Sequence, residues 1–188
     1  MGLLRPLVTL LGLCGCLAGT TRNARDEEST RNDAGVPTFT LSNGVVVPMV
    51  GLGGASGVSY EHVKSAIEGG YRFIDTAQSH SWGYKEEDVG RAVKDARKRF
   101  QDDSRDYVFV QSKIHPQDLG YRATKEALHF SLGRLRVSSL DSILIHKPRC
   151  WGDICSREPE GTWHDSWTAL EEAVDAGQVR SIGVSLSS

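Results

Sequence analysis

The feature that most constrains the fold of this chain is a regular alternation of short apolar runs with segments of helical spacing. Five runs, at residues 49–52, 71–74, 107–112, 142–145 and 179–184, fit β-strands, and four segments with helical periodicity separate them. The runs are too apolar to face water on either side, which is typical of a parallel sheet covered by helices. The alternation therefore predicts an α/β fold of βαβαβαβαβ order with right-handed crossovers.

Each of the last four predicted strands is followed by a polar or ionisable residue: Asp75, Lys113, His146 and Ser185. Taken singly, each has an ordinary explanation, such as a turn cap for Asp75 or a solvated surface charge for Lys113. In a closed barrel the carboxyl ends of the strands converge on one mouth, so the four together predict a shared site. A doubly wound sheet, the alternative, would spread them along an edge.

The residue types at these positions suit proton transfer. An ion pair between Lys113 and Asp75 would hold an ammonium in place, and a fixed positive charge lowers the pKa of a neighbouring phenol or thiol. The imidazole of His146 can donate to a carbonyl oxygen. Such a set can protonate a developing alkoxide but contains no electron source, so a hydride would have to come from a cofactor.

The segment before the second strand contains a predicted hairpin and a glycine-rich loop. Residues 39–41 and 45–47 are joined by Asn43-Gly44, a strong hairpin signal. The loop at 51–57 (GLGGASG) is one residue too long for the Rossmann dinucleotide fingerprint, and no acidic residue except Asp75 closes a second strand at the expected distance. We expect its glycines, Gly53 and Gly54 among them, to let a ligand approach the backbone.

The first residues differ from the rest of the chain. A single Arg5 precedes the apolar run 7–17, which is typical of a secretory signal peptide at residues 1–18, cleaved after Ala18. The run is too short to span a bilayer as a helix, although a retained signal anchor is the alternative. Residues 19–36 are polar and without periodicity, which predicts a disordered linker. We expect an ER-lumenal or secreted protein if the signal is cleaved, and a membrane-anchored one otherwise.

Cysteines and charge limit the remaining classes of function. Cys150 and Cys155, in the run CWGDIC, can form a loop disulfide in an oxidising compartment or remain thiols if reduced. A zinc site with His146 lacks a second ligand pair of the usual spacing, so we expect no metal site. The net charge of -2 and pI near 6.3 offer nucleic acid no basic field, and we expect no nucleic-acid partner.

From residue 39 to residue 185 the chain resembles the aldo-keto reductases. The resemblance rests on LSNGVVVPMVGLG, GYRFIDTA, FVQSK, LDSILIHKP and LEEAVDAGQVRSIGVS. Members of this family are (β/α)8 TIM barrels that use NADPH to reduce aldehydes and ketones. The resemblance therefore implies an NADPH cofactor, a small-molecule carbonyl substrate and a protein that is monomeric when full length.

The resemblance also implies roles for individual residues. Asp75, Lys113 and His146 match three members of the family's catalytic tetrad. Lys113 would tune the proton donor, Asp75 would hold Lys113 and lie near the nicotinamide ribose, and His146 would orient the substrate carbonyl. Ser185 matches the serine that binds the nicotinamide carboxamide, and Gly53 and Gly54 would lie at the cofactor.

Three departures from the family pattern set the alternatives. The tyrosine that donates the proton normally stands five residues after the aspartate, where this chain has His80. Tyr84, four residues later in a segment long enough to bend back, is our first choice for the donor, and His80 is the second. The asparagine expected after Ser185 is Leu186. Finally, residues 37–188 hold about five of the eight βα units, which predicts an incomplete barrel with an N-terminal β-hairpin.

Three hypotheses for function follow. The first is an NADPH-dependent carbonyl reductase, whose pocket would be bordered by the loop 147–161 with Trp151. The second is a barrel that binds the cofactor without efficient catalysis, which His80 and Leu186 favour. The third is a fragment or truncated isoform, with an exposed edge at its fifth strand, that does not fold or act alone.

Overall fold

The computed structural model describes residues 35–100 and 107–185. Its main sheet has five parallel strands in the order β3-β4-β5-β6-β7. They span Leu52–Gly53, Phe73–Asp75, Phe109–Ile114, Leu140–Ile145 and Val179–Val184. The spatial order equals the chain order, as in a barrel, whereas a doubly wound sheet reverses direction at a switch point. The structure thus confirms an α/β fold consistent with part of a (β/α)8 barrel.

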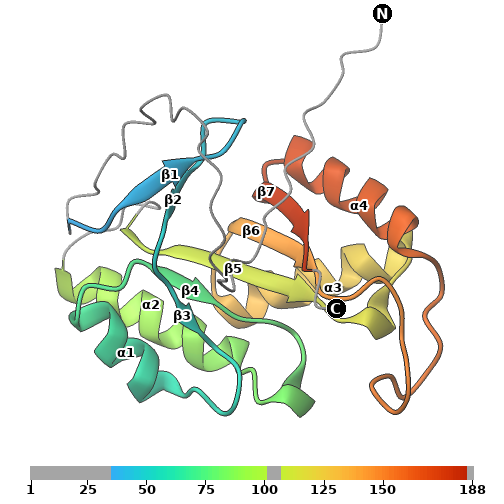
Figure 1. Cartoon of the computed structure of the whole chain (residues 1–188), viewed down its shortest axis with the longest axis horizontal. Helices are drawn as coiled ribbons and strands as arrows, with labels where there is room; N and C mark the ends of the chain where they lie inside the picture. The colour runs from blue at the N-terminus through green and yellow to red at the C-terminus, as the bar shows by residue number, and fades with distance from the viewer. Residues whose placement is uncertain (1–34, 101–106, 186–188) are drawn as a thin grey trace, which may run out of the picture.

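Four helices follow the strands in turn and lie along one side of the sheet (Figure 1). They are α1 (Tyr60–Glu68), α2 (Glu86–Phe100), α3 (Tyr121–Leu135) and α4 (Trp163–Asp175). Each helix packs against the next, and their apolar stripes meet the outward side chains of the strands. This core contains Ile74, Val110 and Ile143 from the strands and Val63, Val93, Leu132 and Leu170 from the helices.

The predicted hairpin is present and covers the beginning of the sheet. β1 (Thr38–Thr40) and β2 (Val46–Pro48) pair antiparallel, and Gly44 takes the left-handed conformation that the turn requires (φ 83°). An apolar cluster of Leu41, Val45, Val47 and Phe109, with Phe73 packed against it, joins the hairpin to the first residues of β4 and β5. The hairpin therefore covers the amino-terminal ends of the strands, and the predicted site residues lie at the carboxyl ends.

Strands β4 and β5 extend further than the sequence predicted, and this affects two residues of the site. Asp75 is the last residue of β4, and Lys113 lies inside β5 instead of just beyond it. The backbone of Lys113 stays in the ladder because it is in register with Leu144 of β6, which extends to Ile145. His146 and Ser185 do follow directly after β6 and β7, as expected.

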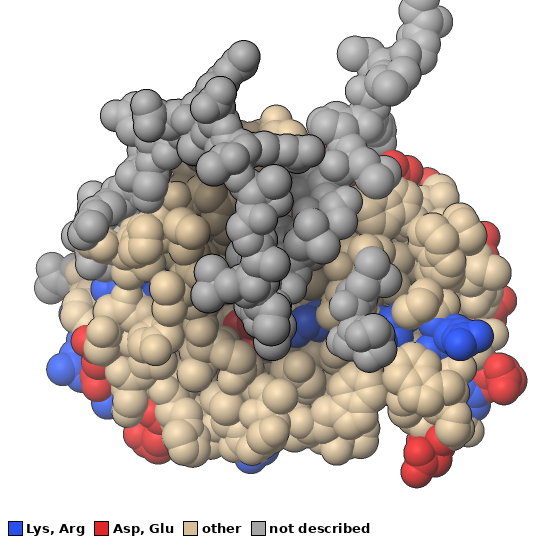
Figure 2. Space-filling model, viewed as in Figure 1, with Lys and Arg blue, Asp and Glu red and all other residues tan. Residues whose placement is uncertain are grey.

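Several predictions fall outside the described residues: the signal peptide at 1–18, most of the linker at 19–36, and Leu186. Within the described ranges, no helix combines the length and apolar character needed to cross a membrane. On the face shown in Figure 2, positively and negatively charged side chains are interspersed around the rim of the described surface.

Candidate active site

The centre of the site is an ion pair between Lys113 and Asp75. The ammonium nitrogen of Lys113 lies 2.6 Å from each carboxylate oxygen of Asp75 and donates to the carbonyl oxygen of Thr76 at 3.1 Å. The Nε2 of Gln111, which is in register with Asp75, donates to the same carboxylate at 2.8 Å. The three acceptors around the ammonium satisfy its three protons, so its position is fixed.

Burial controls the electrostatics of this pair. The Lys113 side chain is 7% exposed and that of Asp75 27% exposed. Removal from water lowers the pKa of Lys113 from its usual value, and the charge and hydrogen bonds of Asp75 oppose that shift. The carboxylate is therefore what keeps a buried ammonium charged at this position.

Tyr84 lies next to the ion pair. Its ring is buried, with the Lys113 ammonium 5.1 Å from the ring centroid and the His146 ring 5.8 Å away, edge to face. Among the described residues, no hydrogen bond of its hydroxyl is found. The segment after Asp75 thus bends back as predicted.

The direction of the Tyr84 pKa differs from the sequence expectation. We expected a fixed ammonium to lower the pKa of the phenol, but the pKa of Tyr84 is raised, first by burial and then by the charge of Asp75. That expectation is wrong for the free protein. The reason is that both oxygens of Asp75 neutralise the ammonium of Lys113, so desolvation of the phenolate dominates.

The segment 79–84 is held in place from the neighbouring glycine-rich loop. The N–H of Ser56 donates to the carbonyl of Trp82 at 3.0 Å, and that of Gly57 to the carbonyl of Gly83 at 3.2 Å. Gly83 has φ 82°, and a Cβ there would lie 2.5 Å from the Gly57 nitrogen. Only glycine fits this turn, which directs Tyr84 toward Lys113.

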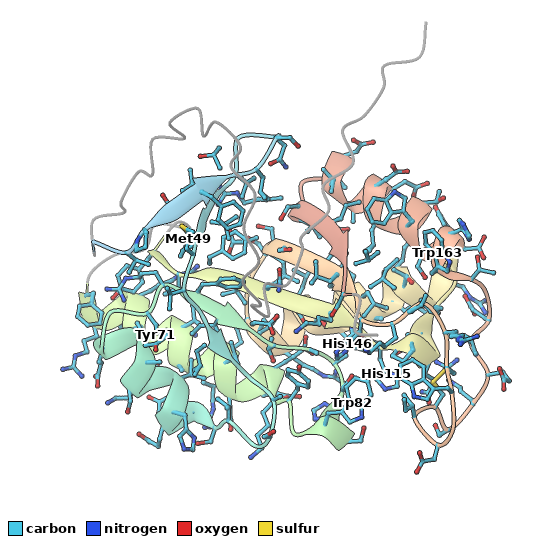
Figure 3. All side chains as sticks on the ribbon, in the orientation of Figure 1. Met49, Tyr71, Trp82, His115, His146 and Trp163 are labelled. Carbon is cyan, nitrogen blue, oxygen red and sulfur yellow. A yellow bond between two sulfur atoms is a disulfide. The ribbon has the colours of Figure 1, made fainter. Side chains whose placement is uncertain are left out.

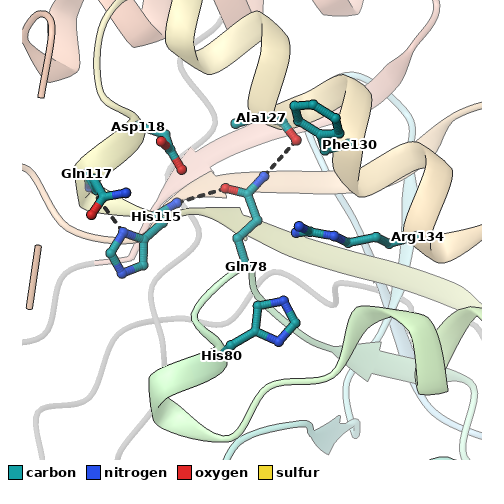
Figure 4. Close-up of a pocket in the computed structure, with 8 residues that line it drawn as sticks. All are labelled: Gln78, His80, His115, Gln117, Asp118, Ala127, Phe130 and Arg134. Atoms are coloured by element: carbon teal, nitrogen blue, oxygen red, sulfur yellow. Dashed lines mark hydrogen bonds between the residues drawn. The ribbon is translucent and has the colours of Figure 1, made fainter. Parts of the chain in front are cut away.

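His80 lies elsewhere. It is exposed, begins the short 3₁₀ helix η1 (His80–Trp82), and lines a separate cavity of about 240 Å³ beside α3 (Figure 4). The cavity wall also includes His115, Phe130 and Arg134. Buried Gln78 also lines this cavity, and its side chain accepts from the N–H of His115 and donates to the Ala127 carbonyl. The structure therefore brings Tyr84, and not His80, to the ion pair.

His146 completes the cluster from the end of β6. Its imidazole is buried, with Ser79 Oγ 3.3 Å from Nδ1 and the Trp82 ring centroid 4.7 Å away, edge to face. Figure 3 shows Trp82 and His146 close together at one end of the strands. Burial lowers the pKa of His146 to about 3, and the charges of Lys113, Lys147 and His115 act in the same direction. The imidazole is neutral at physiological pH and can serve as a hydrogen-bond donor without carrying charge.

Comparison with known proteins identifies the family. Residues 57–188 match the model of the Aldo/keto reductase family. The chain belongs to this family. It is 37% identical over 166 residues to aldo-keto reductase family 1 member A1-A of Danio rerio. This match covers 79% of this chain and 49% of that protein. It is also 37% identical over 152 residues to glyoxal reductase of Bacillus subtilis, with the same two coverages.

Solved structures agree with the sequence comparison. The aldo-keto reductase of Bombyx mori, solved in complex with NADP, has a TM-score of 0.68 at 30% identity and matches 79% of this chain and 50% of its own. The aldo-keto reductase of Brucella melitensis has a TM-score of 0.65 at 32% identity, covering 79% and 53% of the two chains. This chain spans about half the length of the curated relatives that it matches.

In this aldo-keto reductase chain, Gly53 and Gly54 lie next to Asp75, whereas Ser185 follows the end of β7. Gly53 is in register with Asp75, and a Cβ at Gly53 would meet nothing within 4 Å. Gly54 instead serves the sheet, because its N–H donates to the Asp75 carbonyl at 2.7 Å and a Cβ there would lie 2.8 Å from that oxygen. Ser185 is half-buried beside the end of β6, where its N–H donates to the Ile145 carbonyl.

These residues fit the nicotinamide end of such a cofactor. The backbone at Gly53 leaves room for a ligand, and the Asp75 carboxylate is partly exposed next to it. The amide of Gln111 lies beside this carboxylate and donates to it at 2.8 Å. The open backbone, the carboxylate and the amide are the kinds of group that bind a polar carboxamide and ribose.

Sequence reasoning missed Ser79 and Trp82, which contact His146, and the buried Gln78 and Glu86, which bond to residues of α3. Glu86 stands in the first turn of α2, where acids are usually solvated, yet it is fully buried and accepts from Ser112 and Ser131 at 2.7 Å each. Ser79 and Trp82 flank His80, so the altered tyrosine spacing was the signal that could have pointed to them.

Two of the four cysteines belong to the described residues, and they are joined. Cys150 and Cys155 form a disulfide in the loop that follows His146 and precedes α4. In residues 35–100 and 107–185, no group of three or more histidines, cysteines or acids is arranged to hold a metal ion.

Proposed function

We propose that the protein carrying this chain reduces aldehydes or ketones to alcohols with NADPH. The observation that carries this proposal is the meeting of Tyr84, His146 and the Lys113–Asp75 pair at the carboxyl ends of three parallel strands. Membership of the aldo-keto reductase family and a solved relative that contains NADP support the same chemistry. Because the chain spans about half of its relatives, the proposal concerns the activity of the whole protein.

The four side chains take different parts in this proposal. Tyr84 donates a proton to the carbonyl oxygen, since its ring lies next to the Lys113 ammonium and to His146. His146 donates a hydrogen bond to the same oxygen as a neutral imidazole. Asp75 holds Lys113 and, with Gly53 and Ser185, lies at the nicotinamide. When bound, NADPH supplies the hydride that the carbonyl carbon accepts.

A second function has one observation in its favour. The chain has His80 at the position where the family's proton-donating tyrosine normally stands, and this departure suits a barrel that binds the cofactor with little turnover. The truncated, non-enzymatic form stays as the remaining alternative. It differs from the other two in that the chain neither binds the cofactor nor unfolds cooperatively.

The experiment measures cofactor binding and turnover separately. NADPH binding is followed by fluorescence, and turnover by loss of dihydronicotinamide absorbance with an aldehyde panel that includes glyoxal. Both the 188-residue chain and any longer product of the same gene are assayed. Turnover that is lost in Lys113→Met supports the reductase, whereas binding without turnover on every carbonyl supports the second function. Absence of both from every form rules out both.

We also propose that the protein enters the secretory pathway, with residues 1–18 removed as a signal peptide. The disulfide between Cys150 and Cys155 supports an oxidising compartment. N-terminal sequencing of the protein from its native cells should find Gly19 first. An intact N-terminus in the membrane fraction would instead favour the retained anchor. Light scattering on the full-length protein tests the proposed monomer.

A further inference from the structure

Ser79 contacts His146 but is not one of the four side chains to which the proposed function gives a part, which are Asp75, Tyr84, Lys113 and His146. It is buried, and its hydroxyl lies 3.3 Å from Nδ1 of His146. Within the part of the chain that the structure describes, this is the one hydrogen bond of the Ser79 hydroxyl and the one hydrogen bond of the His146 ring. In the described ranges, the two groups are therefore each other's hydrogen-bond partners.

The backbone around Ser79 fixes the position of its hydroxyl. The carbonyl of Ser79 accepts from the N–H of Trp82 at 3.0 Å, which begins the short helix η1. The Trp82 ring then lies edge to face on His146, at 4.7 Å between centroids and 84° between planes. Ser79 and Trp82 thus hold the imidazole from two directions, by a hydrogen bond and by a ring contact.

The contact matters because a neutral imidazole carries its proton on only one nitrogen. If Nδ1 carried it, Nε2 would be an acceptor and could not donate to a carbonyl oxygen. If the Ser79 hydroxyl donates to Nδ1, the proton must reside on Nε2. Because the pKa of His146 is lowered to about 3, the ring near neutral pH carries a single proton, which resides on either Nδ1 or Nε2.

We propose that Ser79 is a positioning residue of this site: its hydroxyl donates to Nδ1 of His146 and keeps the imidazole proton on Nε2, where a substrate carbonyl can accept it. This inference rests on the proposed function, because the use of the Nε2 proton is carbonyl binding. By this inference, the segment between Asp75 and Tyr84 orients the imidazole of His146 through Ser79 and Trp82.

The test reads the tautomer directly by NMR of the 188-residue chain with ¹⁵N-labelled histidine. Near neutral pH, the wild type should show a protonated Nε2 and an unprotonated Nδ1 for His146. In Ser79→Ala both nitrogen shifts should move toward the average of the two tautomers. Ser79→Thr, which keeps the hydroxyl, and Ser81→Ala, which removes an exposed serine of the same turn, should retain the wild-type pattern.

Two results would overturn the inference: a protonated Nδ1 in the wild type, or a His146 pattern that Ser79→Ala leaves unchanged. In an active form of the protein, Ser79→Ala should also lower kcat/KM about two- to tenfold, the factor for one neutral hydrogen bond. Ser81→Ala should not. If no form reduces a carbonyl, the proposed function fails, while the NMR result still decides the role of Ser79.

Discussion

The ammonium of Lys113 lies 2.6 Å from both carboxylate oxygens of Asp75, and the two residues come from neighbouring parallel strands. Strand β5 carries the ammonium inside the sheet, and the end of β4 carries the carboxylate at its rim. A charge this deep is costly without its partner. The pair therefore links the stability of the sheet to the chemistry of the site.

The first prediction concerns that link. Asp75→Asn should lower the free energy of unfolding by about 1.5–3 kcal/mol, because the ammonium of Lys113 loses a charged hydrogen-bond partner. Adding Lys113→Met should restore part of the loss, since the uncompensated charge is then gone. Urea unfolding of the two single variants and the double variant gives the coupling energy.

Strictly additive effects in this cycle would contradict the pair as described. Lys64→Gln serves as the control, because Lys64 forms its ion pair with Glu68 on the surface, where solvent screens it. Its effect on unfolding should be much smaller than that of Asp75→Asn.

The second prediction separates the two candidate proton donors. Tyr84→Phe should lower kcat about 10²–10⁴-fold in an active form of the protein, the usual range for losing a general acid. His80→Phe should leave kcat near the wild-type value, because His80 lines a different cavity. Steady-state kinetics with one aldehyde decides between them. A loss of activity in Lys113→Met and His80→Phe but not in Tyr84→Phe would move the donor role to His80.

Sequence patterns predicted the strand order and three members of the site for a simple reason. Apolar runs locate the strands, and side chains at the carboxyl ends of successive parallel strands converge in a barrel. Asp75, Lys113 and His146 could therefore be placed near one another without coordinates. The sequence ranked Tyr84 ahead of His80 as the donor but left both open, because their positions depend on hydrogen bonds from Ser56 and Gly57 that have no local signal.

Burial was the other quantity that the sequence did not reveal. The charge pattern suggested that Lys113 lowers the pKa of the donor, but the sign depends on how far Tyr84 is removed from water. Likewise, an acid in the first turn of a helix is ordinarily solvated, whereas Glu86 is enclosed by Ser112 and Ser131. Both outcomes arise from tertiary packing and not from residue type.

The third prediction tests the turn that places Tyr84. Gly83→Ala should destabilise the chain by more than the roughly 1–2 kcal/mol of a left-handed non-glycine residue, because its Cβ would also lie 2.5 Å from the Gly57 nitrogen. Gly177→Ala is the matched control, with φ 70° and nothing within 4 Å of the added Cβ. Urea unfolding compares the two variants. Equal losses would mean that the contact with Gly57 contributes nothing.

The fourth prediction follows from the pKa of His146, which is lowered to about 3 by burial and then by Lys113, Lys147 and His115. The unfolded chain, with an ordinary histidine pKa near 6.5, binds this proton first as the pH falls. The free energy of unfolding should therefore decrease from about pH 6.5 toward pH 3, by at most about 1.4 kcal/mol per pH unit from this residue.

The measurement for His146 is denaturant unfolding between pH 7 and pH 5 for the wild type and His146→Gln. The variant should lose stability less steeply, because its buried amide does not titrate. Parallel slopes for the two proteins would show that His146 takes up its proton equally well in the folded state, contrary to its burial.

The last prediction concerns the disulfide in the loop that follows His146. Cys150 and Cys155 are five positions apart, and closing so short a loop stabilises a chain by about 2 kcal/mol in the chain-entropy model. Reduction with dithiothreitol should therefore lower the Tm by about 4–8 °C for a protein of this size. The Cys150→Ser/Cys155→Ser variant should melt at the temperature of the reduced wild type and should not respond to the reductant. A Tm of the wild type that reduction leaves unchanged would mean that the loop 147–161 is held by its other contacts, such as Ser156 with Gln117 and Arg157 with Asp118.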